Sequence, residues 1–228
     1  MHTLLVLVLS ASALLGQETL FSGPQPGEEL PPLSVMAVNG PRAGKIVHYV
    51  SEFGLAPVLI VFMHQLDRNV QRNVWPLERF AADRAHAGLR SLVVFLNADR
   101  IEGQRMMRHW LDEHGDLIPI AVSIDGIEGP GSYGLNKNVA VTAILAHRKK
   151  VVFNRTIVQP GYSEAVKIIA AAVPLVGGEV PDEKDFLYGP GNGNRTLPLP
   201  ANMPSGFLYG PARVRSSKPA SKLKEDIH

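Results

Sequence analysis

Two continuous apolar runs joined by a helical pattern constrain the fold of this chain more than any other feature. The runs, residues 57–62 and 91–96, are rich in Val, Leu and Ile and show no alternation with polar residues. This pattern is typical of strands that are buried on both faces. Between them, residues 69–90 place apolar side chains three and four positions apart, as an amphipathic helix does. The order predicts a sheet covered by helices.

The alternation of strands and helices continues on both sides of the two runs. Upstream, residues 33–38 and 45–50 flank Asn39-Gly40, a strong turn signal, and predict a β-hairpin. Downstream, residues 102–114 predict a second helix. Three further strands and a closing helix are then expected at residues 118–124, 139–146, 151–158 and 163–173.

Two details of the expected helices also follow from the sequence. Pro76 lies inside the first long helix and predicts a kink there. The closing helix is expected to begin at a cap formed by Ser163 and Glu164 and to end before Pro174.

The N-terminus has the outline of a signal peptide. Apolar residues 4–9 are followed by small residues, and cleavage is expected after Ala13 or Gly16. The apolar run is too short for a stable membrane span, which takes about 20 residues. We therefore expect residues 1–16 to be a signal peptide, residues 17–32 to be a linker, and the protein to be exported to the periplasm or the extracellular space.

The C-terminal part of the chain changes in composition after residue 177. Residues 178–228 are rich in Pro and Gly and show no helical or strand periodicity, which predicts an irregular, disordered tail. Residues 33–177 are then the folded domain. The pentapeptide Phe-Leu-Tyr-Gly-Pro occurs at 186–190 and again at 207–211. Its aromatic residues are candidates for docking to a partner or to the domain itself, or for local apolar clips: Phe186, Tyr188, Phe207 and Tyr209.

The chain contains no cysteine. Thiol–disulfide exchange and thiol peroxidation both need a thiolate nucleophile, so both activities are excluded. Disulfide staples are excluded too, but a domain of about 150 residues buries roughly 70% of its unfolded surface and can be stable without them. The net charge of +2 argues against a dedicated nucleic-acid binder, which needs a concentrated basic face.

The order of elements and several residues resemble the thioredoxin-like domains of the alkyl hydroperoxide reductase and thiol-specific antioxidant group. The residues that carry this resemblance before the first buried run are Gly27, Pro31, Leu33, Gly40 and Lys45. The loop at residues 126–136 resembles one found in exported thioredoxin-like proteins of planctomycete-type bacteria. The resemblance covers residues 21–177. It implies an α/β fold with a thioredoxin-like central mixed sheet flanked by helices, an N-terminal β-hairpin extension and an irregular C-terminal tail.

The same resemblance implies a degenerate active site. In the family, two redox cysteines lie after the central strand, at the N-terminus of the first long helix, where the helix dipole stabilises a thiolate. Asp67 and Val70 stand at these positions, and Asp67 is expected either to cap the helix or to form a surface pair with Arg68. Val141 stands where the family has a cis-proline, and we predict a trans bond because a non-proline cis bond costs about 3 kcal/mol. The candidate binding residues are His64, Asp67, Arg68, Asn69, Val70, Val141 and Thr142.

Three function hypotheses remain open. The favoured one is a redox-inactive, exported binding module for an unknown protein or peptide. The second is an enzyme that uses no thiol, for example with metal-dependent chemistry around His64, Asp67 and the loop after Asp125. The third is a structural component of an envelope assembly that docks through the repeated pentapeptide. We expect no catalytic residue, no cofactor and no bound metal.

Overall fold

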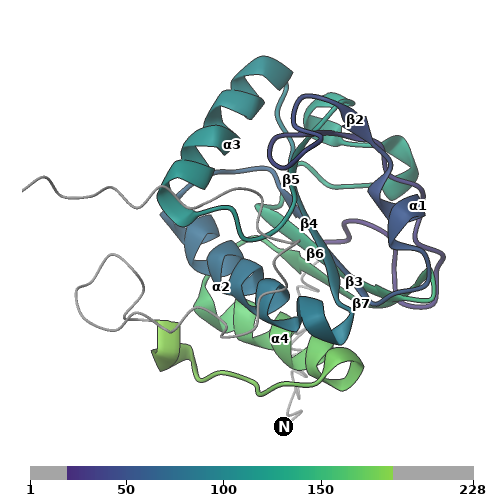
Figure 1. The fold of residues 1–228 in the computed structure, drawn as a ribbon, viewed down its shortest axis with the longest axis vertical. Coiled ribbons are helices and arrows are strands. Elements are labelled where there is room, and N and C mark those ends of the chain that lie inside the picture. Colours follow the sequence, from purple (N-terminus) through teal and green to yellow (C-terminus); the bar gives the residue numbers. More distant parts are fainter. Residues whose placement is uncertain (1–19, 187–228) are drawn as a thin grey trace, which may run out of the picture.

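The computed structural model describes residues 20–186, which contain a mixed sheet of seven strands (Figure 1). The strands are β1 (Val35–Ala37), β2 (Ile46–Val47), β3 (Val58–Met63), β4 (Arg90–Phe95), β5 (Ile120–Ser123), β6 (Val141–His147) and β7 (Lys150–Ile157). Their order across the sheet is β2-β1-β5-β4-β3-β6-β7. β3, β4 and β5 are parallel, whereas the β1 and β6 pairings are antiparallel. The predicted mixed α/β sheet is thus confirmed.

The two apolar runs form the centre of the sheet, as predicted. All six residues of β3 are buried, and β3 lies between β4 on one side and β6 on the other. Five of the six residues of β4 are buried. Because both faces of these strands are covered, apolar residues occupy every position, and no alternation can develop.

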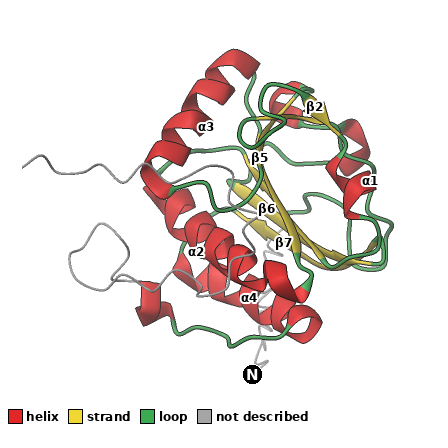
Figure 2. Cartoon of the chain, viewed as in Figure 1, coloured by secondary structure: helices red, strands yellow, loops and turns green. Residues whose placement is uncertain are grey.

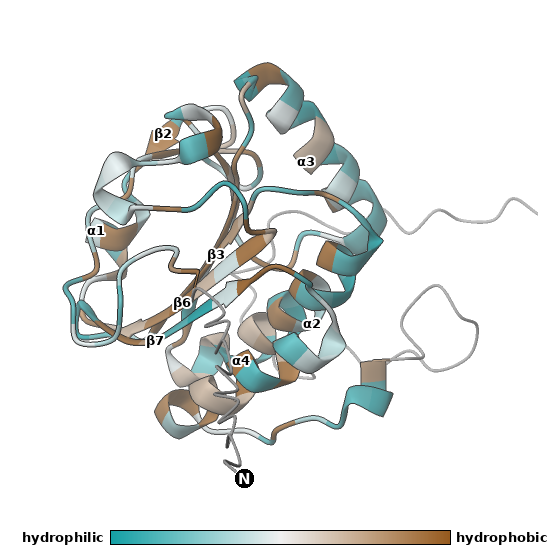
Figure 3. Ribbon diagram, turned by 180° about the vertical axis from the view of Figure 1, so that it is seen from behind, coloured by the Kyte–Doolittle hydropathy of each residue, from teal (hydrophilic) through white to brown (hydrophobic). Residues whose placement is uncertain are grey.

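Helices cover both faces of the sheet (Figure 2). They are α1 (Tyr49–Phe53), α2 (Arg68–Arg84), α3 (Arg100–His114) and α4 (Tyr162–Val176). Single 3₁₀ turns lie at Ala85–Ala87, Gly126–Glu128, Gly131–Tyr133 and Glu183–Phe186. α2, α3 and α4 pack on one face with one apolar cluster, and α1 packs on the other face with a second cluster. Apolar and polar residues alternate along the helices (Figure 3). This is expected of a helix that packs one side on a sheet and exposes the other side to solvent.

The predicted N-terminal hairpin is present but shorter than expected. β2 ends at Val47, and Tyr49 and Val50 already belong to α1. The prediction of a strand through residue 50 was therefore wrong. Tyr49 and Val50 are adjacent and both buried, which a helical turn permits and a half-exposed strand does not.

The closing helix also differs from its prediction at both ends. Its N-cap is Gly161, which makes no side-chain capping bond, so the predicted cap at Ser163 and Glu164 was wrong. Glu164 instead accepts two hydrogen bonds from Arg155 of β7. Pro174 lies inside the last turn of the helix. A proline there removes one backbone hydrogen bond, and the packing of this turn on the domain compensates for the loss. Earlier in the chain, α2 continues across Pro76.

Hydrogen bonds from Asn39 fasten the hairpin to the rest of the sheet. The Asn39 amide donates to Asp116 Oδ1 at 2.6 Å and to the Ile118 carbonyl at 2.8 Å. Its oxygen accepts from the backbone N–H of Ile120 at 2.8 Å. The buried Asn39 side chain therefore provides hydrogen-bond partners for two backbone groups at the start of β5.

The described parts of the two segments that flank the expected domain, residues 20–32 and 178–186, pack against it. Leu30 and Ser22 are buried, and Phe186 is buried against α4 with its ring 5.8 Å from that of Tyr162. No helix within residues 20–186 is long and apolar enough to cross a membrane. The expected signal peptide and the candidates Tyr188, Phe207 and Tyr209 lie outside the described residues.

Candidate functional site

The degenerate active site predicted from the sequence lies at the carboxyl end of β3. Met63 is the last residue of this strand, and the backbone N–H of His64 donates to the Ala140 carbonyl at 3.0 Å. This bond joins the end of β3 to the residue just before β6. The loop to α2 therefore starts beside Val141, as the resemblance implies.

Asp67 caps α2, as predicted. Its backbone is extended, and its Oδ1 accepts hydrogen bonds from the N–H groups of Asn69 at 2.8 Å and Val70 at 2.9 Å. These amides are among those that a helix leaves unpaired at its N-terminus, where the dipole favours a negative charge. A carboxylate of the chain itself thus takes up the donors that could otherwise stabilise a thiolate.

Loss of the Asp67 cap should destabilise the protein without changing its fold. We expect Asp67→Ala to lower the free energy of unfolding by about 1 kcal/mol, the usual contribution of an N-cap. Asp67→Asn keeps an acceptor oxygen and should cost less than half as much. Urea unfolding of the three proteins measures the difference, and equal stabilities of Asp67→Ala and wild type would show that the cap contributes nothing.

Four of the seven candidate binding residues are buried. They are His64, Val70, Val141 and Thr142. Val141 pairs with Met63 across the ladder of β3 and β6, and residues 20–186 contain no cis peptide bond, so the predicted trans bond is confirmed. The exposed candidates are Asp67, Arg68 and Asn69, which the loop and the first turn of α2 present to solvent together with Gln65.

The hydroxyl of Thr142 binds the N-terminal segment, a contact that the sequence did not reveal. Thr142 Oγ1 and Ser22 Oγ are 2.6 Å apart, and Ser22 Oγ also accepts from the Asn136 N–H at 3.0 Å. The Asn154 amide donates to the carbonyls of Ser22 and Pro24. More than a hundred residues separate Ser22 from these partners, so no local pattern signals the cluster. The hydroxyl of Thr142 is therefore already hydrogen-bonded within the protein.

His64 is a buried imidazole without a hydrogen bond. Its side chain is 9% exposed, and neither ring nitrogen has a partner within hydrogen-bond geometry. Burial lowers the pKa of His64, an effect that the nearby backbone of Ile127 opposes in part. The ring is therefore neutral at physiological pH. Such a nitrogen could accept a hydrogen bond or bind a metal ion.

The metal hypothesis needs more ligands than this region provides. Within residues 20–186, no three His, Cys, Asp or Glu side chains come close enough together to hold a metal ion. Asp67 already uses its Oδ1 to cap α2. A metal ion at His64 and Asp67 would thus lack a third protein ligand from the described chain, whereas protein metal sites commonly have three or four.

Comparison with solved structures supports the class of fold. A putative thiol:disulfide interchange protein DsbE from Chlorobium tepidum is 19% identical, with a TM-score of 0.52 over 67% of this chain and 99% of that chain. A putative protein disulfide isomerase from Bacteroides thetaiotaomicron is 15% identical, with a TM-score of 0.52 over 70% and 96%. A hypothetical protein from Sinorhizobium meliloti is 16% identical, with a TM-score of 0.53 over 69% and 88%. No protein-family model matches the chain, and neither does any curated protein.

The chain therefore has the thioredoxin-like fold. At these identities the likeness concerns the fold alone. The two named neighbours are described as thiol–disulfide proteins, whereas this chain has no cysteine and carries a capping carboxylate at the start of α2.

Proposed function

We propose that this protein is a redox-inactive binding module that holds a protein or peptide segment at the N-terminal end of α2. The observation that carries the proposal is the Asp67 cap: Asp67, which the resemblance sets at one of the two redox positions of the family, binds the first amides of α2. The scaffold around it is intact, with β3 and β6 paired along their full contact. A site that keeps its shape and lacks a nucleophile is suited to binding rather than thiol chemistry.

The exposed residues around the cap support a peptide as the ligand. Gln65, Arg68 and Asn69 offer several donors and acceptors that can pair with a peptide backbone. Ile127, whose backbone lies near His64, is 40% exposed and adds an apolar contact. Polar groups beside one apolar residue provide both hydrogen bonding and burial for an extended segment.

Site-specific photo-crosslinking tests this proposal. A photoreactive amino acid at Asn69 should yield a defined adduct in an envelope extract, and the adduct should be lost when Arg68→Glu reverses the neighbouring charge. The matched control is the same amino acid at Val152, an exposed residue of β7 at the opposite end of the sheet. No adduct at Asn69, or the same adducts from both positions, would contradict the proposal.

Export belongs to the same proposal, on the strength of the apolar run at residues 4–9. We expect the protein recovered from its own cells to begin at Leu14 or Gln17. Mass spectrometry of the intact purified chain measures this directly. A chain that still begins at Met1 in the envelope fraction would contradict a cleaved signal peptide.

A further inference from the structure

The turn between β6 and β7 carries three consecutive cationic residues, Arg148, Lys149 and Lys150. All three are exposed. β6 is antiparallel to β3 and begins beside the carboxyl end of β3, so the turn that follows β6 lies at the amino end of β3. The Asp67 cap lies at the opposite end of the sheet, so the turn is separate from the site proposed above.

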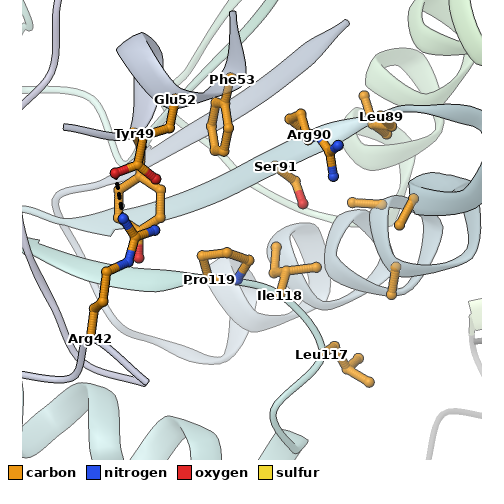
Figure 4. A pocket seen from close by; sticks show the side chains of 13 residues that line it. Arg42, Tyr49, Glu52, Phe53, Leu89, Arg90, Ser91, Leu117, Ile118 and Pro119 are labelled. Carbon is orange, nitrogen blue, oxygen red and sulfur yellow. Dashed lines mark hydrogen bonds and ion pairs between the residues drawn. The ribbon is translucent and has the colours of Figure 1, made fainter. Parts of the chain in front are cut away.

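Neighbouring parts of the chain hold the turn in place. The backbone N–H of Arg148 donates to the Leu55 carbonyl at 3.3 Å, and the Lys149 carbonyl accepts from the N–H of Leu30 at 2.8 Å. Figure 4 shows this end of the sheet from close by, with Phe53 of α1 beside the start of β4. Leu55 follows Phe53 by two residues. The backbone of the turn is therefore anchored on two sides and keeps a fixed position relative to Leu55.

The backbone of the turn is also strained. Arg148 has a φ of 53° and Lys149 a φ of 63°, and within residues 20–186 they are the only non-glycine residues with a positive φ. Two-residue hairpin turns with a positive φ at both positions favour Asn-Gly, because a Cβ atom disfavours this conformation. Strain of this kind persists where the surrounding structure enforces it, and it is often part of a functional site. The two cations therefore stand at positions that backbone geometry alone would give to other residues.

The cations of the turn form no ion pair within the described chain. None of the ion pairs among residues 20–186 involves Arg148, Lys149 or Lys150. Glu29 lies opposite Lys150 in an isolated antiparallel bridge, and Glu28 precedes it, but both are exposed and neither pairs with a cation of the turn. Three cations against two carboxylates leave an excess of positive charge, which favours an anionic partner.

Leu55 adds an apolar group beside these charges, and it is 64% exposed. Cations next to an exposed leucine suit the headgroup layer of a membrane, where lipid phosphates pair with the cations and the apolar side chain reaches the acyl boundary. A soluble polyanion would pair with the cations but leave Leu55 in water. We propose that the β6–β7 turn and Leu55 bind the surface of an anionic membrane, with the cations at lipid phosphates and Leu55 between the headgroups.

Co-sedimentation of the purified full chain with lipid vesicles tests the proposal. The protein should bind vesicles of phosphatidylcholine and phosphatidylglycerol mixed at roughly two to one, and it should bind pure phosphatidylcholine vesicles far more weakly. Binding to the anionic vesicles should fall when the salt concentration rises from about 50 mM to about 300 mM, because salt screens exposed charges.

Two triple variants separate the turn from a general effect of net charge. Replacement of the three cations of the turn by Gln should weaken binding to the anionic vesicles by roughly a hundredfold, at about fivefold for each charge. The matched control removes three exposed cations from α3 and should weaken binding by less than about threefold. Its substitutions are Arg100→Gln, Arg105→Gln and Arg108→Gln.

Two single variants test the apolar contact and the strained backbone. Leu55→Ser should weaken vesicle binding by about tenfold and leave binding to soluble polyphosphate unchanged. Lys149→Gly relieves the strain but removes a charge, so it should weaken vesicle binding by about fivefold without lowering the free energy of unfolding. No binding to the anionic vesicles, equal losses from the two triple variants, or full vesicle binding by Leu55→Ser would each overturn the proposal.

Discussion

Glu78→Gln is expected to stabilise the protein by about 3 kcal/mol near pH 7, and by less than about 1 kcal/mol at pH 5. Glu78 lies on α2 with 1% of its surface exposed. Its Oε1 accepts a hydrogen bond from Trp110 Nε1 at 3.0 Å, whereas Oε2 is buried without a partner. Burial raises the pKa of Glu78 from 4.5 to about 8, and the Trp110 bond opposes the shift in part. The carboxyl group is therefore protonated in the folded protein at neutral pH.

The pH dependence follows from the different pKa values of the folded and unfolded chain. Below pH 4.5 both states hold the proton, so Glu78 adds no pH-dependent cost. As the pH rises from 4.5 to about 8, only the unfolded state releases the proton, and the stability of the wild type falls by about 1.4 kcal/mol per pH unit. Glutamine does not titrate, so the variant should lack this decline.

Urea unfolding of both proteins from pH 5 to pH 8, followed by tryptophan fluorescence, measures the effect. Glu179→Gln, at an exposed position, is the matched control. Its free energy of unfolding should change with pH as that of the wild type does. If the free energies of unfolding of Glu78→Gln and the wild type change with pH in the same way, Glu78 is not the buried, protonated group inferred above.

Phe186→Ala is expected to destabilise the domain by about 3 kcal/mol, within the range for buried aromatic residues. The Phe186 side chain is 6% exposed, belongs to the apolar cluster of α2, α3 and α4, and stacks on Tyr162 with an interplanar angle of 18°. The first residue of the first pentapeptide copy thus packs against the domain itself. The folded unit accordingly includes contacts made beyond residue 177.

A control variant and a double-mutant cycle show whether this effect is specific to the aromatic ring of Phe186. Val180→Ala, at an exposed position of the same segment, should change the free energy of unfolding by less than about 0.5 kcal/mol. A double-mutant cycle of Phe186→Ala with Tyr162→Ala should give a coupling of about 1 kcal/mol. A Phe186→Ala variant as stable as the wild type would show that the contact does not hold the segment.

The sequence predicted the centre of the sheet well because β3, β4 and β6 are six or seven residues long and almost completely buried. β3, β4, β6 and β7 coincide with the predicted runs to within two residues, and α2 and α3 begin close to their predicted starts. α1 was missed, because a helix of five residues is too short to develop a period. The ends of α4 were misplaced, because propensity cannot show that Arg155 binds Glu164 or that packing retains Pro174.

The candidate site was predicted in part. Asp67 follows a buried strand and precedes an amphipathic pattern, so its capping role is local and could be predicted. The contact between Ser22 and Thr142 and the burial of Glu78 against Trp110 depend on residues far apart in the chain. A glutamate in an amphipathic helix usually faces solvent, so only the packing of α3 on α2 reveals its environment.

We infer from the resemblance that Asp67 and Val70 stand at the two positions where the family carries its redox cysteines. The double variant Asp67→Cys, Val70→Cys tests it most directly, through the pKa of the thiol introduced at position 67, measured by its absorbance as a thiolate. We expect a pKa near 7 or below for this thiol, because the amides of Asn69 and Val70 and the dipole of α2 would stabilise the thiolate. We also expect the two thiols to form a disulfide. A pKa at the ordinary value of about 8.5, with no disulfide formed, would contradict it.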